Sequence, residues 1–230
     1  LSGPARDQLS WSDLDGRKYA AIGTSKLLVI YYESAFYDIT PVEADQSGVT
    51  FTTTNGSATV TVNVTAAQVA VGDYVKFKNV TLPGSGTSFV AADFTTNVFE
   101  VTSLSGSNAY TITMPSNETS SGISSAGSAT QNRYVTIGPI AQTSAFGWGT
   151  DTYGSEKWGE ASTSSNVTLD PGNWSLYTFG QTLVATIHNG RTFTWNTIAQ
   201  DGPSAIDTRA VVMTNAPTAS VITLVSDRDR

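Results

Sequence analysis

The chain of 230 residues has no cysteine, one histidine and few charged side chains. The lack of cysteine excludes disulfide bonds and cysteine-ligated metal sites, and it leaves the redox compartment open. Charged residues make up 13% of the chain, against roughly 25% in an average soluble domain. A membrane-spanning helix needs roughly 20 apolar residues. The longest clean apolar run, residues 27–30 with two tyrosines after it, falls far short of that length.

Acidic residues outnumber basic ones. The net charge is −7 and the isoelectric point of the sequence is near 4.5. Non-specific attraction to nucleic acid or to an anionic membrane is therefore not expected. Any contact with DNA is expected to be weakly binding.

Serine, threonine, glycine and valine fill most of the chain where charged residues are missing. Short hydroxyl and β-branched side chains suit pleated strands and disfavour long helices. The composition therefore predicts an all-β protein.

A strand-turn-strand unit occurs twice. Each copy follows a Trp-Ser pair, at Trp11 and at Trp174, and a glycine, at Gly16 and at Gly180. The copies comprise strand, polar turn and strand at residues 19–23, 24–26 and 27–32, and again at 183–187, 188–190 and 191–196. Repetition of one unit around foreign material points to a radial or stacked β architecture that carries an insertion. Such architectures serve mostly as scaffolds and binding platforms.

The stretch between the copies has its own character. Period-two alternation at residues 49–52, 58–64 and 74–78 indicates half-buried antiparallel strands, and glycine-containing turns separate them. Six or seven short strands in this stretch predict a small antiparallel sandwich or barrel. The expected domains are a propeller-like host domain at 1–41 and 138–230, and an inserted β domain at 42–137.

Two segments carry further expectations. Residues 116–130 are poor in apolar side chains and are predicted to form a mobile loop. Residues 221–225 are predicted to form a strand without a return strand. The second expectation, together with a first residue that is leucine, suggests that the chain is a fragment of a longer protein.

Aromatic residues alternate with glycine at the start of the second host segment. Trp148, Tyr153 and Trp158 lie there. Tryptophan faces stack on sugar rings, so one hypothesis is a glycan-binding platform. The other is packing against neighbouring strands or a neighbouring subunit. The second is favoured, because the segment lacks the Asp, Asn and Arg cluster that orients sugar hydroxyls.

Other candidate sites are weaker. Asp13, Asp15 and Gly16 contain part of a calcium-loop pattern, but the remaining ligands are missing and a tight turn is favoured. His188 precedes Asn189-Gly190, for which a type I′ turn is expected, and it lacks the partners of a catalytic histidine. We predict no metal site and no cofactor.

Glycoside hydrolysis would require two facing carboxylates, which have no fixed sequence motif. Seven carboxylates fall at predicted turns or strand ends: Asp13, Asp15, Glu33, Asp38, Asp151, Glu156 and Glu160. The sequence does not indicate which of them face one another. The chain is therefore predicted not to be an enzyme, with a polysaccharide-degrading activity as the remaining catalytic alternative.

Several segments resemble a family of tail proteins from short-tailed bacteriophages. They are residues 18–31, 37–41, 146–149, 158–159, 174–185 and 225–230, with residues 71–77, 99–103 and 109–113 in the inserted domain. The resemblance is to the nozzle or hub proteins that continue the DNA channel below the portal and adaptor rings. Their motifs are short, but together they cover most of the chain.

The resemblance implies a structural virion component built around a partial β-propeller-like fold. It also implies a homo-oligomeric ring, commonly a hexamer, that contacts adaptor, portal or fibre proteins and lets duplex DNA pass without tight binding. No catalytic residues come with the family. A host-surface glycan-binding module of a phage tail is the alternative. Two complete hairpin units and part of a third are too few to close a propeller alone.

Overall fold

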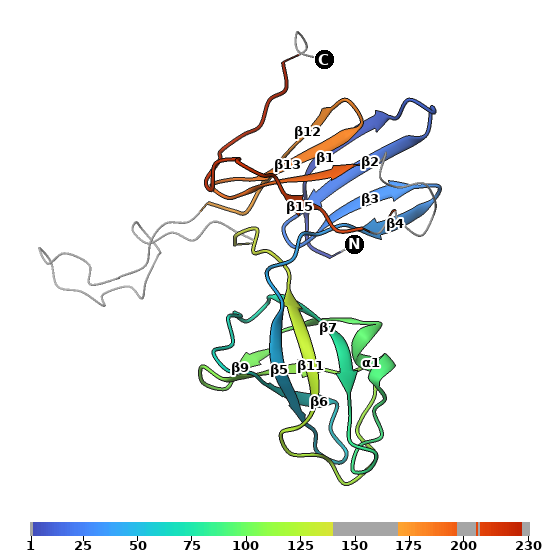
Figure 1. Cartoon of the computed structure of the whole chain (residues 1–230), viewed down its shortest axis with the longest axis vertical. Helices are drawn as coiled ribbons and strands as arrows, with labels where there is room; N and C mark the ends of the chain where they lie inside the picture. The colour runs from blue at the N-terminus through green and yellow to red at the C-terminus, as the bar shows by residue number, and fades with distance from the viewer. Residues whose placement is uncertain (1, 140–169, 197–205, 207, 227–230) are drawn as a thin grey trace, which may run out of the picture. The chain divides into compact units, whose positions relative to one another are not determined.

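The computed structural model describes residues 2–139, 170–196, 206 and 208–226. The chain folds into two compact units: unit 1 combines Leu1–Pro41 with Thr136–Arg230, and unit 2 is Val42–Val135. Among the described residues, the elements are strands apart from one short helix, α1, at Ala91–Thr95. The prediction of an all-β chain is confirmed. Figure 1 shows the strands of unit 1 in blue and in orange to red, and those of unit 2 mainly in green.

The described residues of unit 1 form two four-stranded antiparallel sheets, each with its strands in sequence order. The first sheet comprises β1 (Ala5–Ser12), β2 (Lys18–Thr24), β3 (Leu28–Tyr32) and β4 (Ala35–Asp38). The second comprises β12 (Trp174–Phe179), β13 (Thr182–Ile187), β14 (Thr192–Asn196) and β15 (Val211–Val212). Each sheet is thus a simple meander, which is the strand order of a propeller blade.

Trp174 joins the two sheets of unit 1. Its side chain is 3% exposed, and its indole Nε1 donates a hydrogen bond to the backbone oxygen of Thr24 over 2.8 Å. A Cβ atom at Gly23 would lie 2.5 Å from Cδ1 of the Trp174 ring, so the ring occupies the space that this glycine leaves open. A second link is the backbone nitrogen of Leu176, which donates to Asp7 over 2.8 Å.

The two tryptophans of the repeated unit do not occupy equivalent positions. Trp11 lies opposite Tyr19, beside the turn that joins β1 to β2. Trp174 lies opposite Ile187, at the end of the hairpin far from the β12–β13 turn. The repeated strand-turn-strand units are present, but the Trp-Ser pairs do not mark equivalent positions in them, because Trp11 lies near the end of β1 and Trp174 is the first residue of β12.

The prediction of a strand at residues 221–225 is wrong. Ser220 forms isolated bridges to His188 and Gly190, and no ladder follows them in the described part of the chain. The backbone nitrogen of Thr223 donates instead to the side chain of Ser175 over 3.2 Å. Ile222 and Leu224 are 62% and 75% exposed, so apolar composition here does not reflect burial in a sheet.

Unit 2 contains one seven-stranded antiparallel sheet in the order β8-β7-β11-β5-β6-β10-β9. Its strands are β5 (Gln46–Thr52), β6 (Thr59–Asn63), β7 (Tyr74–Thr81), β8 (Val98–Glu100), β9 (Ser103–Leu104), β10 (Ala109–Thr113) and β11 (Ala126–Arg133). The predicted sandwich is therefore not found, and the seven strands follow the barrel alternative.

The connection from β8 to β9 explains why this sheet curls. These strands lie at opposite edges of the sheet, yet only Val101 and Thr102 separate them. Such a short link spans at most about 11 Å. The two edges must therefore approach one another, as in a barrel. The interior holds an aromatic cluster in which Phe94 of α1 packs against Phe51 with ring centroids 4.4 Å apart.

Unit 2 also begins and ends with paired backbone. Val42 and Tyr134 form an antiparallel bridge. The nitrogen of Glu43 donates to the oxygen of Arg133 over 2.7 Å. The segments that enter and leave the unit therefore run side by side.

Residues 116–130 do not form the predicted loop throughout. Their last part belongs to β11, and Glu118 is fully buried. Its carboxylate accepts hydrogen bonds from the side chains of Thr53, Thr87 and Ser88 and from the backbone nitrogens of Ser88 and Ser120, at 2.6–3.0 Å. Burial by itself would raise the pKa of Glu118, but these hydrogen bonds outweigh it and lower the pKa to about 2. One carboxylate thus ties three separate loops together.

We expect Gly23→Ala to destabilise unit 1 by about 1–3 kcal/mol, because the added methyl group would overlap the Trp174 ring. The change is measured by urea denaturation of the purified chain. Gly84→Ala is the matched control, since its Cβ would meet nothing within 4 Å. Equal effects from the two substitutions would contradict the proposed role of Gly23.

We expect Glu118→Ala to destabilise unit 2 by about 3 kcal/mol, because it leaves several donors without an acceptor. Glu118→Gln keeps an acceptor oxygen and should cost less.

The two variants also predict a pH dependence. The folded pKa of Glu118, about 2, is lower than its ordinary value of 4.5. Its contribution is therefore complete above pH 4.5 and is lost as the pH falls toward 2. Glu118→Gln should flatten this part of the curve of unfolding free energy against pH. An unchanged slope in the variant would show that Glu118 is not the titrating group.

Candidate functional site

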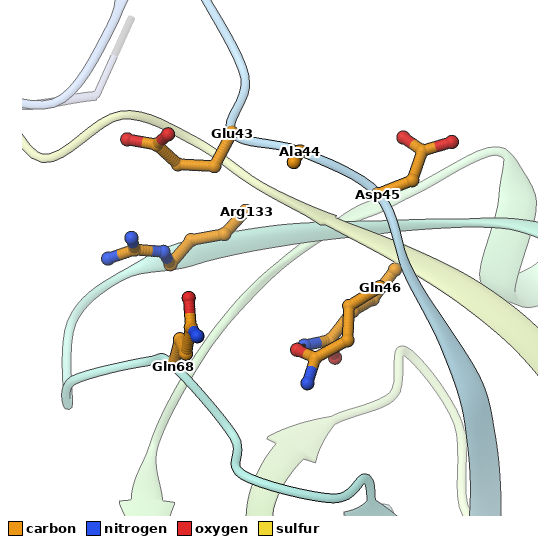
Figure 2. Close-up of a pocket in the computed structure, with 7 residues that line it drawn as sticks. Glu43, Ala44, Asp45, Gln46, Gln68 and Arg133 are labelled. Atoms are coloured by element: carbon orange, nitrogen blue, oxygen red, sulfur yellow. Dashed lines mark hydrogen bonds between the residues drawn. The ribbon is translucent and has the colours of Figure 1, made fainter.

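A polar pocket of about 220 Å³ opens on unit 2. Figure 2 shows its lining side chains, which come from the start of β5, the end of β11 and the segment before β7. The lining residues are Glu43, Ala44, Asp45, Gln46, Gln68, Gln131 and Arg133. Carboxylate, amide and guanidinium groups together can donate to and accept from a small polar ligand.

A chain of hydrogen bonds leads from the core of unit 2 to this pocket. The buried Tyr110 hydroxyl donates to Oε1 of Gln131 over 2.5 Å. Nε2 of Gln131 donates to Oε1 of Gln46 over 2.8 Å, and Nε2 of Gln46 donates to the backbone oxygen of Thr65 over 2.7 Å. Burial raises the pKa of Tyr110, so this phenol stays protonated and remains the donor. The floor of the pocket is thus a network whose polar groups already bind one another.

The two carboxylates of the pocket do not form a hydrolytic pair. Asp45 forms an ion pair with Lys78 and accepts a hydrogen bond from Asn132. These contacts hold the pKa of Asp45 below its ordinary value, so it is a poor proton donor. In Figure 2, the Glu43 and Asp45 carboxylates point to opposite sides. A retaining or inverting glycosidase instead needs both carboxyl groups to flank one bond.

A larger hollow of about 560 Å³ lies on the first sheet of unit 1. Its lining residues come from β1, from β2 and from β3 with its following turn, and they are Ser10, Trp11, Ser12, Lys18, Tyr19, Ala20, Tyr31, Tyr32, Glu33 and Ser34. Trp11 lies opposite Tyr19 on the neighbouring strand, and the ring of Tyr32 stacks on that of Tyr19. Their rings stack with centroids 5.5 Å and 4.8 Å apart. This row lies on the buried face, where the edge of Trp195 from β14 contacts it.

The aromatic residues predicted as a platform, Trp148, Tyr153 and Trp158, lie outside the described residues. Asp151, Glu156 and Glu160 of the carboxylate set lie outside them as well. Two aromatic side chains of the first sheet, Tyr31 and Phe36, are exposed, and they were not predicted as a site. Their signal in the sequence is the pair of tyrosines at the end of a run that otherwise reads as core.

Asp13 and Gly16 form the predicted tight turn. The nitrogen of Gly16 donates to the oxygen of Asp13 over 3.2 Å. The Asp13 carboxylate accepts from the nitrogens of Asp15 and Arg17 and from the hydroxyl of Tyr19. This carboxylate thus stabilises the β1–β2 connection.

Asp38 also has a structural role. It forms an ion pair with Arg209 over 2.8 Å and accepts from the Thr40 hydroxyl. Within the described residues, no group of three or more His, Cys, Asp or Glu residues is placed to hold a metal ion.

His188 lies in a turn, as predicted, but the turn is not of type I′. The nitrogen of Gly190 donates to the oxygen of Ile187 over 2.8 Å, and Asn189 has a φ of 56°. A type I′ turn requires positive φ at both expected central residues, Asn189 and Gly190, and Gly190 is not among the residues with positive φ. Its Nδ1 lies 3.3 Å from the oxygen of Val221.

No helix in the described part of the chain is long and apolar enough to cross a membrane. No description of a known protein family matches the chain, and no curated protein matches it.

Among solved structures, one match is the Phage phi92 endosialidase, with 16% sequence identity and a TM-score of 0.32. The match covers 89% of this chain but 30% of the endosialidase chain. A similarity this low establishes neither a common fold nor a common activity.

We expect Gln131→Leu to lower the unfolding free energy of unit 2 by about 2 kcal/mol, because it leaves the buried Tyr110 hydroxyl without its acceptor. Gln68→Leu, at an exposed residue of the same pocket, should have little effect. Urea denaturation of both variants distinguishes the two cases. If Gln131→Leu is as stable as the unmodified chain, the hydrogen-bond chain is not a structural requirement.

Proposed function

We propose that this chain is a non-catalytic structural component of a bacteriophage tail and that it forms part of a ring around the DNA-ejection channel. The phage assignment draws on the sequence resemblance to nozzle or hub proteins. The observation that supports the structural role best is the pairing of two four-stranded meanders through Trp174 and Gly23.

The two meanders have the form of neighbouring blades. Propellers use four to eight such sheets around an axis. The two described sheets do not close a propeller, so further blades would be needed to complete it. The ring around the channel is a separate assembly, made of several copies of the chain. In this proposal the ring is a homo-oligomer, commonly a hexamer in the resembling family, and it contacts adaptor, portal or fibre proteins within the virion.

The roles of four described carboxylates support a structural function. Asp13 and Asp38 stabilise a turn and an ion pair in unit 1. In unit 2, Asp45 is paired with Lys78 and Glu118 joins three loops. These groups hold the fold together, whereas a hydrolase would direct two of them at one substrate bond.

The acidic charge is compatible with a DNA conduit. Each lysine or arginine contact to a phosphate strengthens binding to DNA, and such contacts would slow the passage of DNA. With a net charge of −7, each subunit offers little attraction to the duplex.

The proposal predicts that the full-length protein forms rings with an axial channel, visible by electron microscopy. It also predicts that these rings bind duplex DNA weakly at physiological ionic strength and release no reducing sugar from polysaccharides. A monomeric peripheral particle would contradict the conduit. Tight DNA binding would contradict the role assigned to the charge, and released sugar would contradict the absence of catalysis.

Recognition of a host-surface glycan is a second candidate function. One observation favours it: Tyr31 and Phe36 are exposed side by side on the first sheet of unit 1, with ring centroids 5.0 Å apart. Exposed aromatic faces next to a hollow are a common way to hold a sugar ring through its C–H groups.

A further inference from the structure

One face of the first sheet in unit 1 carries a row of four cross-strand neighbours. Ser10, Ala20, Tyr31 and Phe36 lie opposite one another across β1, β2, β3 and β4. Side chains alternate between the faces of a strand. This row therefore lies on the face opposite to Tyr19, whose ring is buried against the second sheet.

The side chains in this row differ sharply in size. Ser10 and Ala20 have small side chains, whereas Tyr31 and Phe36 are 40% and 54% exposed. The aromatic rings thus form a ridge beside a low floor. Ser10, Ala20 and Tyr31 all line the hollow of about 560 Å³. This volume is within the range of about 300–1,000 Å³ for small-molecule sites.

Polar groups surround this floor. Ser12 and Lys18 are neighbours in the next row of the same face, and Glu33 and Ser34 form the β3–β4 turn. Serine hydroxyls donate and accept, the ammonium group donates and the carboxylate accepts. This combination suits a ligand with many hydroxyl groups and an apolar face, which describes a pyranose ring.

The charge of the hollow selects among glycans. Lys18 and Glu33 contribute one charge of each sign, and the chain as a whole carries −7. A polyanionic glycan would be repelled by the net charge and would meet one cation. A neutral glycan meets no such penalty.

We propose that this hollow binds a neutral oligosaccharide, with Tyr31 as the stacking face, Phe36 packed beside it just outside the hollow, and the serines, Lys18 and Glu33 as hydrogen-bonding partners. The inference rests on the second candidate function and assigns it a site within residues 10–36. This site is separate from Trp148, Tyr153 and Trp158.

The test is a titration of the full chain with maltohexaose, cellohexaose and chitohexaose as neutral probes, and with polysialic acid as an anionic probe. Calorimetry and tryptophan fluorescence are suitable readouts, because Trp11 also lines the hollow. Tyr31→Ala and Phe36→Ala should each weaken binding of a neutral probe by about tenfold or more. Leu104→Ala is the control, since Leu104 is 47% exposed but belongs to β9 of unit 2, and it should leave binding unchanged.

Neutral binding that is lost in the two variants and kept in the control supports the proposal. Binding that survives Tyr31→Ala and Phe36→Ala overturns this site while leaving glycan recognition by the chain in place. Binding of polysialic acid alone overturns the neutral specificity. If none of the probes binds, the inference is overturned. Retention of the full-length protein on host-surface polysaccharide then shows separately whether the second candidate function survives.

Discussion

The contact between Trp174 and Gly23 is the constraint on which unit 1 depends. It connects positions about 150 residues apart in the sequence, and it uses the largest side chain against the residue without one. The hydrogen bond from the indole to Thr24 fixes the ring at its polar end, so the contact has a defined direction as well as buried area. The same two sheets are also linked by the hydrogen bond from Leu176 to Asp7 and by the contacts of Trp195 with Trp11 and Tyr19.

Unit 2 reaches stability by a different route. Its sheet curls so that its two edges approach one another, and its aromatic core fills the interior. The connections at one end are then held by a buried carboxylate and not by more apolar surface. The same preference for internal pairing appears in the polar pocket, where Gln131 and Gln46 continue the chain that starts at Tyr110. Polar groups in this unit mostly serve the fold, which is why the exposed aromatic ridge of unit 1 is the stronger candidate for a ligand.

The sequence predicts those elements of the fold that depend on residues close together in the chain. Period-two alternation and glycine-containing turns identify most strands of both units, because both signals are local. Prediction from the sequence fails where a residue's role depends on a contact with a residue far away in the chain. The role of Glu118 requires donors from Thr53 and Thr87, and residues 116–130 therefore read as an unstructured polar stretch. The apolar residues around Ile222 read as a strand, but they have no ladder beside them in the described structure. Tyr31 reads as the end of a core strand, and the register with Phe36 is needed to place it on the outer face.

The bridge between Val42 and Tyr134 has a consequence for the order of folding. The cost of closing a loop grows with the number of residues in it, although slowly. While unit 2 is unfolded, β4 and β12 are separated by a long flexible tether, and the contact of Trp174 with Gly23 must close it. Once unit 2 has folded, its two ends lie together, and most residues of that tether no longer add to the length of the loop that must be closed. The insertion, which interrupts unit 1 in sequence, thereby shortens the search by which unit 1 assembles.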